Sequence, residues 1–553
     1  MNKWWKKAVV YQIYTKSFYD TNGDGIGDLR GILQKLDYIQ GLGADTLWLN
    51  PIYVSPDVDN GYDIADYYQI DPQYGTMEDF KELLAEVHRR GMRLIMDMVL
   101  NHTSDEHEWF KRSRMSKEDP YRDYYIWRPG KDGREPNNWG NYFYEGSAWE
   151  YDGATGEYYL HNYSYKMPDL NWENPKVFED MCAMMTWWLE LGIDGFRMDA
   201  VNRLKKPAGL PDSPNPPTPP VGIHGYVVDR TMCANQPGIH ELLHRINREV
   251  WSKYDILVVG ETGNVDSALA LDYVNEAHEE IDMVFHFEIA KNAELADIHK
   301  IKDVQRRWYG VMQQGGWISQ YLSNHDSPRQ VSRFADDGEY RVESACMLAA
   351  LIHTWPGTPY VYQGEEIGMV NVDFPSIEYY NEKYTVGKYY TMVEKGEDPE
   401  KALNSLKMMS RDNARTPMQW TGGAQAGFTS GKPWLNVNPR YPEINAEKDL
   451  AAESSVYRFY QRLIRMRREN DVLAYGSYRQ VLAEDDDLFA HFRELGDTGL
   501  FVLANYSPRR IQVDLGQWIG ETYSLKLCNY PAVEPGGTAI LRPYETRLYV
   551  KNW

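Results

Sequence analysis

Acidic, basic and histidine side chains follow directly after several short apolar runs of the 553-residue sequence. These residues are Asp97 and His102, Arg197 and Asp199, Glu261, and His325 and Asp326. Two converging carboxylates can hydrolyse a glycosidic bond, because one attacks the anomeric carbon while the other protonates the leaving oxygen. A single Asp or Glu after a strand is more often a helix cap or an ion-pair partner. Four such groups that meet in one pocket would instead indicate glycoside hydrolysis.

Short apolar runs alternate with amphipathic segments over the first hundred residues. Residues 9–14, 46–49 and 93–99 are predicted strands, whereas apolar residues recur with a helical period in 29–39 and 80–87. This order predicts parallel strands joined by helices.

The alternation continues along the chain. The further predicted elements are a helix at 176–191 and strands near 195–198, 257–259, 283–287, 317–322 and 358–362. Eight strand-helix units predict an α/β fold, the (β/α)8 barrel, whose catalytic groups lie at the C-terminal ends of the strands. The candidate carboxylates and histidines occupy such positions, so we expect them to share one pocket.

The chain divides into four predicted parts. Residues 1–102 and 171–480 form the barrel, 103–170 form an inserted subdomain over its mouth, and 481–553 form an antiparallel β-sandwich. The insertion is rich in Tyr, Trp, Gly and Asn. A second long loop, 203–238, contains the run PDSPNPPTPP and is expected to lie over the pocket as a lid.

Composition limits the classes of partner. The formal net charge of −22 disfavours binding to nucleic acid and to anionic membranes. Hydrophobic residues make up 42% of the sequence, which is typical of a globular protein. A small neutral ligand, such as an oligosaccharide or disaccharide, is easier to accommodate, and no organic cofactor is expected. The oligomeric state is left open.

The cysteines and the apolar runs indicate a compartment. The four cysteines have neither CxxC nor metal-ligand spacing, as expected for reduced thiols. The opening MNKWWKKAVV contains an apolar stretch shorter than a signal sequence requires, and no apolar run has membrane length. We therefore expect a cytoplasmic protein.

The segment DTNGDGIGD alternates oxygen-bearing residues with glycines in the manner of a calcium loop. The candidate ligands are Asp20, Asn22, Asp24, the carbonyl of Ile26, and Asp28. Structural Ca²⁺ is the expected ion, with Mg²⁺ as the alternative. A turn that caps the next helix would show the same residue types without a metal.

Five segments resemble the α-amylase superfamily of glycoside hydrolases. They are DMVLNH (97–102), MPDLN (167–171), GFRMD (195–199), the GE pair (260–261) and SNHD (323–326). Three further segments resemble its oligo-1,6-glucosidase and α-glucosidase branch: WWKKAVVYQIY (4–14), DNGYDI (59–64) and RDNARTPMQW (411–420). The resemblance spans essentially the whole chain.

The resemblance implies the role of each candidate. Asp199 would be the nucleophile, Glu261 the general acid/base and Asp326 the stabiliser of the transition state. His102, Arg197 and His325 would hold hydroxyls or orient the nucleophile. Arg197 is expected to lower the pKa of Asp199, and a drier or more negative environment to raise that of Glu261. A retaining pair of carboxyls would lie about 5–5.5 Å apart.

Further residues are matched to the sugar pocket by the same resemblance. Tyr62 and Tyr163 would pack their rings on the terminal glucose, although most aromatic residues in a chain with 42 tyrosines fill the core or surface. Asp59 and Arg415 would close the pocket and bind the outermost hydroxyl, which predicts exo action. An ordinary interdomain ion pair is the alternative for these two.

Departures from the branch leave the linkage open. Met167 stands where glutamine is common, Ala200 where valine is usual, and Ser327 where glutamine is common. Within the branch, valine at the position of Ala200 accompanies α-1,6 cleavage and smaller residues accompany α-1,4 cleavage. The predicted enzyme is a retaining exo-α-glucosidase acting on α-1,4 or α-1,6 links. The alternatives are a trehalose-6-phosphate hydrolase and a relative that transfers or isomerises glucosides.

A non-catalytic function is the remaining alternative. Amino-acid transporter heavy chains share this fold and act as partner proteins, but they carry a transmembrane anchor. The sequence contains the catalytic carboxylates and no such anchor, so an enzyme is expected.

Overall fold

Eight parallel strands form a barrel at the centre of the computed structural model, which describes residues 3–217, 225–289, 297–531 and 537–553. The strand order is β11-β10-β9-β5-β2-β1-β13-β12. The bounds are β1 Val10–Ile13, β2 Thr46–Leu49, β5 Arg93–Val99, β9 Gly195–Asp199, β10 Leu257–Glu261, β11 Met283–Phe285, β12 Ser319–Gln320 and β13 Thr358–Tyr362. A parallel bridge between Val284 and Ile318 joins the outer strands, so the predicted (β/α)8 barrel is confirmed.

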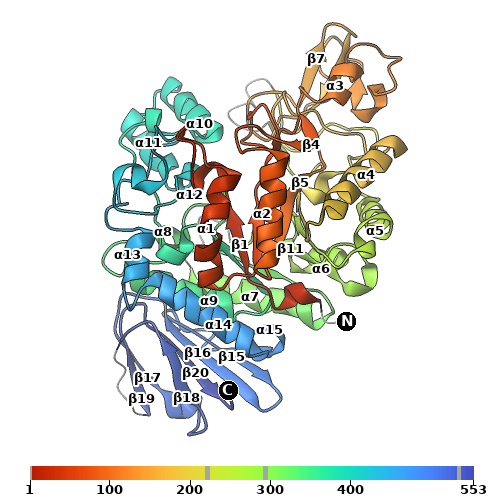
Figure 1. The fold of residues 1–553 in the computed structure, drawn as a ribbon. Coiled ribbons are helices and arrows are strands. Elements are labelled where there is room, and N and C mark those ends of the chain that lie inside the picture. Colours follow the sequence, from red (N-terminus) through yellow and green to blue (C-terminus); the bar gives the residue numbers. More distant parts are fainter. Residues whose placement is uncertain (1–2, 218–224, 290–296, 532–536) are drawn as a thin grey trace.

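Helices surround the barrel and connect its strands (Figure 1). They are α1 Leu29–Leu42, α2 Met77–Arg89, α4 Pro175–Leu191, α5 Ile239–Glu249, α6 Ser267–Val274, α7 Ile298–Gln313 and α9 Arg341–Thr354. Local signals fix several ends: the Asp28 carboxylate accepts the Gly31 N–H at the start of α1, and Thr76 and Asp79 form a capping box on α2. Gly192 ends α4 at φ 110°, a backbone conformation that favours glycine.

The insertion after β5 forms a small lobe at the mouth of the barrel. It contains α3 Glu108–Ser113 and a three-stranded sheet of β6 Trp127–Arg128, β8 Glu157–Leu160 and β7 Trp149–Asp152. The 203–238 loop packs against this lobe, because Val227 pairs with Trp139 and the Trp139 indole donates to the Pro211 carbonyl at 2.9 Å. The end of its PDSPNPPTPP run, from residue 218, lies outside the described residues.

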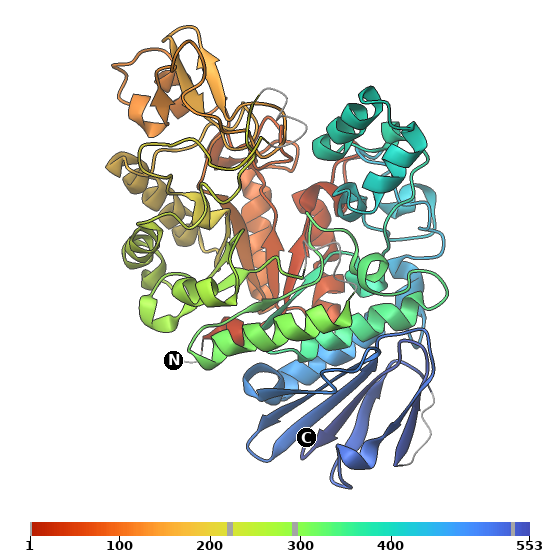
Figure 2. The same cartoon turned by 180° about the vertical axis from the view of Figure 1, so that it is seen from behind.

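A second lobe faces the insertion from the opposite side of the same barrel end (Figures 1 and 2). It consists of α10 Lys383–Glu394, α11 Pro399–Lys407 and the short α12 Asp412–Arg415. Its small core includes Phe374, Tyr380 and Leu403. The sequence patterns did not single out this lobe within 171–480.

The C-terminal part consists of antiparallel sheets beneath the barrel (Figure 1). One sheet has the order β14 Ser477–Val481, β15 Leu488–Leu495, β16 Thr498–Asn505, β20 Thr546–Lys551 and β18 Ser524–Cys528, and the other pairs β17 Ile511–Asp514 with β19 Thr538–Leu541. Apolar side chains from both sheets, including Phe501, Leu503 and Val513, form a shared core. The preceding helices α13 Ala446–Ala451, α14 Val456–Glu469 and α15 Val472–Tyr475 lead from the barrel to these sheets.

Among the described residues, no helix combines the length and the apolar character that a membrane-spanning helix requires.

Candidate active site

The predicted site residues converge at the C-terminal end of the barrel strands. Every predicted catalytic and substrate-binding residue except Arg197 lines a single pocket. The pocket lining also includes residues that the sequence patterns did not single out: Tyr142, Phe143, Arg203, Arg230, Gly263 and Arg411. Position alone could have suggested three of these, because Arg203 and Gly263 closely follow Asp199 and Glu261, and Arg411 opens the RDNARTPMQW motif.

Arg197 lies beneath the pocket and binds three carboxylates. Its Nη1 donates to Asp97 Oδ1 at 2.8 Å and to Asp199 Oδ1 at 2.7 Å, and its Nη2 donates to Glu261 Oε2 at 2.6 Å. The register explains this cluster: Asp97 on β5 pairs with Arg197 on β9, and Asp199 lies two residues further along the same face. One guanidinium therefore fixes both proposed catalytic carboxyls.

The pKa of Asp199 departs from the expectation drawn from the sequence. Burial raises this pKa well above its usual value, and the carboxylates of Glu261 and Asp97 oppose the lowering effect of Arg197. Burial likewise raises the pKa of Asp97 to about 6. Arg197 does lower the Asp199 pKa, as expected, but burial and the neighbouring carboxylates outweigh its effect, so the net shift is upward.

The Asp199 and Glu261 carboxyls also hydrogen-bond to each other. A hydrogen bond between two carboxyls requires a proton on one of them, and the bond to Glu261 adds to the rise in the pKa of Asp199. A direct hydrogen bond between the two carboxyls is compatible with a retaining pair, because an inverting pair stands about 6.5–9.5 Å apart with a water between its carboxyls.

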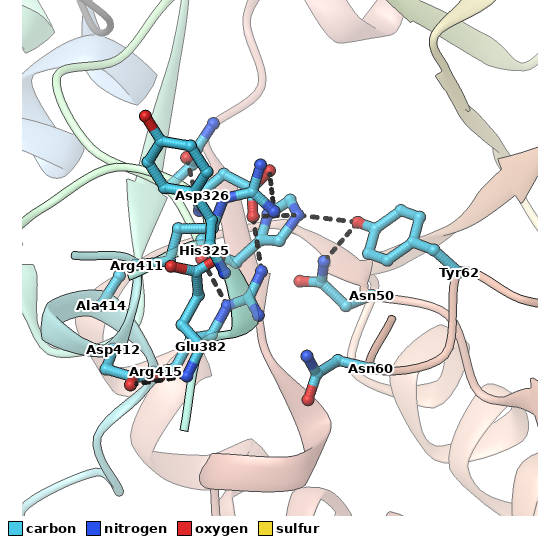
Figure 3. A network of polar contacts seen from close by, with 12 residues as sticks. Asn50, Asn60, Tyr62, His325, Asp326, Glu382, Arg411, Asp412, Ala414 and Arg415 are labelled. Carbon is cyan, nitrogen blue, oxygen red and sulfur yellow. Dashed lines mark hydrogen bonds and ion pairs between the residues drawn. The ribbon is translucent and has the colours of Figure 1, made fainter. Parts of the chain in front are cut away.

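Asp326 lies between two guanidinium groups in the pocket lining (Figure 3). Arg415 Nη2 lies 2.7 Å from Asp326 Oδ1, and Arg411 Nη1 lies 3.5 Å from Asp326 Oδ2. Arg415 also donates through Nε to the His325 carbonyl at 3.1 Å. The structure therefore pairs Arg415 with Asp326 and forms no direct ion pair between Arg415 and Asp59, although both line the pocket.

Asp59 remains in the electrostatic field of the same guanidinium groups. Burial raises its pKa to about 7, and the charges of Arg411 and Arg415 limit this increase. Asp59 can therefore change its charge near neutral pH.

A buried hydrogen-bond chain orients His325 and Tyr62. The Gln12 amide nitrogen lies 2.9 Å from His325 Nδ1, and His325 Nε2 lies 2.8 Å from the Tyr62 hydroxyl (Figure 3). Tyr62 donates to Asp97 Oδ2 at 2.9 Å. Burial lowers the pKa of His325 to about 3, so the imidazole is neutral. Because Nδ1 accepts a hydrogen bond from the Gln12 amide, the single ring proton is on Nε2.

His102 and Tyr163 form another part of the wall. Their ring centroids are 5.0 Å apart, and burial lowers the pKa of His102 to about 4, which keeps it neutral. Asn101 Nδ2 contacts His102 Nδ1 at 3.2 Å and the Asp169 carboxylate at 3.2 Å. Lys206 completes this network by its 2.9 Å ion pair with Asp169.

Arg203 and Arg230 line the pocket together with Ala200 and Gly263. Arg203 donates to the Arg230 carbonyl at 2.6 Å and to the Tyr142 hydroxyl at 3.2 Å. A Cβ at residue 263 would lie 3.0 Å from Arg203 Nη2, so Gly263 leaves room for this guanidinium. Every acceptor recorded for the guanidiniums of Arg203 and Arg230 within the described chain is neutral.

The predicted calcium loop is a compact turn in the structure. Asp20 accepts the N–H groups of Asn22, Gly23 and Gly25, and Asp28 accepts that of Gly31 as the cap of α1. Asn22 and Asp24 are exposed, and the Ile26 N–H donates to Asp24. The described residues contain no group of three or more His, Cys, Asp or Glu side chains arranged to hold a metal. The two candidate ligands that are not carboxylates are the side-chain amide of Asn22 and the backbone carbonyl of Ile26. Both offer oxygen atoms, which suit a hard cation.

Comparisons place this arrangement among known proteins. The family "Alpha amylase, catalytic domain" matches residues 12–476. An oligo-1,6-glucosidase of Parageobacillus thermoglucosidasius is 50% identical over 99% of this chain and 98% of its own. A trehalose-6-phosphate hydrolase of Bacillus subtilis is 44% identical over 99% of this chain and 98% of its own.

Solved structures agree with the sequence comparisons. The crystal structure of Bacillus licheniformis trehalose-6-phosphate hydrolase has a TM-score of 0.92, 44% identity, and coverage of 99% of this chain and 100% of the other. The trehalulose synthase of Pseudomonas mesoacidophila also has a TM-score of 0.92, with 40% identity and 99% coverage of both chains.

Proposed function

This chain belongs to the α-amylase family of glycoside hydrolases and is an α-glucosidase, and we propose that it removes single glucose units from the non-reducing ends of short α-glucosides with retention of configuration. The observation that carries the proposal is the fixation of two close carboxyls, Asp199 and Glu261, by the single guanidinium of Arg197. A close pair of carboxyls favours double displacement, because an inverting pair is spaced to hold a water.

In the first step, Asp199 attacks the anomeric carbon while Glu261 transfers the proton of the pair to the leaving oxygen. A covalent glucosyl ester forms on Asp199 and the C1–O bond to the leaving group breaks. In the second step, Glu261 accepts a proton from water, which attacks the same carbon and releases Asp199 as a carboxylate. Asp326, held by Arg415, is placed to bind hydroxyls as the ring takes on oxocarbenium character.

Exo action is supported by the charged residues that line the pocket beside Asp326. Asp59, Arg411 and Arg415 line the pocket beside Asp326 and offer charged groups to the hydroxyls of a terminal sugar. Neutral His102 and His325 and the ring of Tyr62 also line the pocket. A pocket that ends in charged groups can accept the end of a chain and excludes its middle.

We propose that both α-1,4 and α-1,6 links are accepted. Ala200 lines the pocket next to the nucleophile and has no γ-methyl groups to narrow the leaving-group side. A change of this size alters discrimination by about 1–3 kcal/mol, so a graded preference is expected.

The direct test is a comparison of kcat/KM on p-nitrophenyl α-glucoside, maltose, isomaltose, sucrose, trehalose and trehalose 6-phosphate. The proposal expects glucose release from maltose and isomaltose at the highest rates. A correctly folded protein that releases no glucose from either disaccharide would refute it.

A phosphorylated disaccharide is the second candidate substrate. Arg203 and Arg230 place two guanidinium groups on the leaving-group side, and their recorded hydrogen-bond acceptors are neutral oxygens of the protein. Guanidinium groups are well suited to phosphate. If a phosphorylated disaccharide is the substrate, kcat/KM is expected to be higher for trehalose 6-phosphate than for trehalose, and Arg230→Gln is expected to reduce the ratio of these two values. Equal kcat/KM for the two substrates would exclude this candidate.

We propose that the loop of Asp20, Asn22, Asp24, Ile26 and Asp28 holds a structural Ca²⁺, with Mg²⁺ as the alternative. All its candidate ligand atoms are oxygens, which Ca²⁺ and Mg²⁺ prefer. The loop is distant in sequence from Asp199 and Glu261 and takes no part in the two chemical steps. Chelation, or Asp24→Ala, is expected to lower the melting temperature, because an ion bound only by the folded state stabilises that state. An unchanged melting temperature after verified metal removal would refute the site.

We also propose that the protein works in the cytoplasm. The structure has four free cysteines, Cys182, Cys233, Cys346 and Cys528, and reduced thiols are typical of that compartment. Cell fractionation tests this proposal, and glucosidase activity confined to an extracellular fraction would contradict it.

A further inference from the structure

Two buried amide side chains next to the active site complete a closed ring of hydrogen bonds. Gln12 lies on β1, and Asn50 directly follows β2. Gln12 Nε2 lies 2.9 Å from both Asn50 Oδ1 and His325 Nδ1. Asn50 Nδ2 and His325 Nε2 each lie 2.8 Å from the Tyr62 hydroxyl, which closes the ring (Figure 3). We call Gln12, Asn50, Tyr62 and His325 the polar ring.

The direction of donation in the polar ring follows from Asp97. Burial raises the Asp97 pKa to about 6, so its carboxylate is ionised at neutral pH and can only accept, and Tyr62 donates to Oδ2 at 2.9 Å. The Tyr62 oxygen then accepts from both His325 Nε2 and Asn50 Nδ2. Neutral His325 therefore carries its proton on Nε2 and accepts at Nδ1. Only an amide nitrogen of Gln12 can donate to Nδ1 and to Asn50 Oδ1 at once.

The polar ring connects the pocket lining to the catalytic cluster. Tyr62 and His325 line the pocket, and their aromatic planes are nearly parallel at 8°. The Tyr62 hydroxyl lowers the pKa of Asp97 against the effect of burial, and Asp97 accepts a hydrogen bond from Arg197 at 2.8 Å. Arg197 in turn binds both proposed catalytic carboxyls. The two amides lie outside the pocket lining, so they can influence the reaction only through these side chains.

We propose that Gln12 and Asn50 are positioning residues for the glucosidase reaction. They act through the other members of the polar ring, because the amides fix the proton of His325 on Nε2 and direct the Tyr62 proton to Asp97. The inference rests on the proposed α-glucosidase function and adds residues that orient its site. The Tyr62 oxygen accepts twice and donates once, so its hydrogen-bonding capacity is used within the protein and the residue offers a sugar its aromatic face.

The test uses two substitutions that keep the shape of the amide and change its hydrogen bonding. In Gln12→Glu a carboxylate replaces the donor, so the His325 proton is expected on Nδ1, where residue 12 accepts it. The Tyr62 hydroxyl is then expected to donate to His325 Nε2 instead of Asp97. Asn50→Asp also accepts the Tyr62 proton but leaves the Gln12 donor in place. In that variant His325 should keep its proton on Nε2.

Each full-length variant is examined by nitrogen NMR and by kinetics. NMR of protein labelled at its histidine ring nitrogens shows which nitrogen of His325 is protonated, and the His325 signals are assigned by their loss in His325→Gln. Kinetics give kcat/KM on p-nitrophenyl α-glucoside and maltose, with the melting temperature as the control for folding. Gln320→Glu is the matched control, because Gln320 is a buried glutamine on β12 that hydrogen-bonds to Gln305 and to the Pro356 carbonyl.

Gln12→Glu and Asn50→Asp should each lower kcat/KM by about tenfold, the scale of one lost hydrogen bond to a charged group. Only Gln12→Glu should move the His325 proton to Nδ1, and Gln320→Glu should change neither kcat/KM nor the His325 signals.

Four results would overturn the proposal. They are a wild-type His325 with its proton on Nδ1, a proton that stays on Nε2 in Gln12→Glu, wild-type kcat/KM in both variants, and an equal loss of kcat/KM in Gln320→Glu. Failure of the wild type to hydrolyse p-nitrophenyl α-glucoside would refute the glucosidase function instead, and the NMR measurement would still test the direction of the polar ring.

Discussion

Arg197 determines the electrostatics of the site at the scale of single residues. It is buried to 3% exposure and binds Asp97, Asp199 and Glu261 simultaneously. Breaking a buried ion pair by removal of one partner costs about 3–5 kcal/mol, so this residue also holds the strand ends together. Burial and the neighbouring carboxylates raise the pKa of Asp199, although Arg197 lowers it.

Removing the nucleophile and removing the acid should have different effects. Asp199→Asn is expected to reduce kcat by about 10⁴-fold or more on every substrate, because no glucosyl ester can form. Glu261→Gln should reduce the rate on isomaltose far more than on p-nitrophenyl α-glucoside, whose leaving group needs little protonation. Steady-state kinetics on both substrates check this, with melting temperatures as the control for folding. Equal losses on the two substrates in Glu261→Gln would contradict its role as the acid.

Asp59 should make stability depend on pH. Its pKa is raised to about 7, so ionisation of Asp59 opposes folding once the pH exceeds the unfolded value. The cost grows from about pH 4 to pH 7 and is then constant. Asp59→Asn is therefore expected to raise the melting temperature more at pH 8 than at pH 5, while KM for maltose increases. A gain in melting temperature that does not change with pH would show that Asp59 titrates normally.

At the scale of elements, the C-terminal end of β9 carries the nucleophile directly before a residue with a strained backbone conformation. The nucleophile Asp199 is the last residue of the strand, and Ala200 follows at φ 43°, where the chain turns into a short 3₁₀ helix at Val201–Arg203. This turn brings Arg203 to the pocket lining. Alanine tolerates the turn better than a β-branched residue does, which links the identity of residue 200 to both stability and the shape of the leaving-group side.

Substitution at residue 200 tests this link. Ala200→Val is expected to lower the maltose to isomaltose ratio of kcat/KM and to lower the melting temperature, because a β-branched residue in the left-handed region costs about 1–2 kcal/mol. Ala200→Gly, which relieves the strain, should keep the ratio and raise the melting temperature. The prediction fails if Ala200→Val leaves both the ratio and the melting temperature unchanged.

Regular elements were predictable from the sequence, whereas the lobes at the rim were only partly so. Apolar runs such as 93–99 are buried on both faces of a parallel barrel, so they identify strands without further information. The ion pair between Arg415 and Asp326 and the raised pKa of Asp199 depend on distances in the folded protein and on burial. The periodicity of apolar residues in the sequence gives neither. Helices α10 and α11 occupy a connection without motif or repeat, so the second lobe could not be foreseen.

At the scale of the whole molecule, the C-terminal sheets support the barrel through buried arginines. Arg493 on β15 is fully buried and donates to the carbonyl of Thr354, at the end of α9, at 2.7 Å. It also donates to the carbonyls of Gly476 and Ser477. Burial lowers its pKa to about 9, so the group remains charged at neutral pH. The two parts therefore share one hydrogen-bond network.

Loss of this network should destabilise the molecule without altering its chemistry. Arg493→Ala is expected to lower the free energy of unfolding by about 2–4 kcal/mol, because each buried carbonyl left without a donor costs about 1–3 kcal/mol. Arg479→Ala on β14 is the control, since Arg479 is exposed. Denaturant titration measures the difference. A wild-type free energy of unfolding in Arg493→Ala would show that the two parts are held together by other contacts.

The stereochemistry of the released glucose tests the central claim most directly. Wild-type enzyme is mixed with p-nitrophenyl α-glucoside and the first turnovers are followed by proton NMR, before the product mutarotates. Double displacement through Asp199 and Glu261 predicts that the α anomer appears first and that the β anomer grows in only by mutarotation. Initial formation of the β anomer would contradict the retaining mechanism and the assignment of Asp199 as nucleophile.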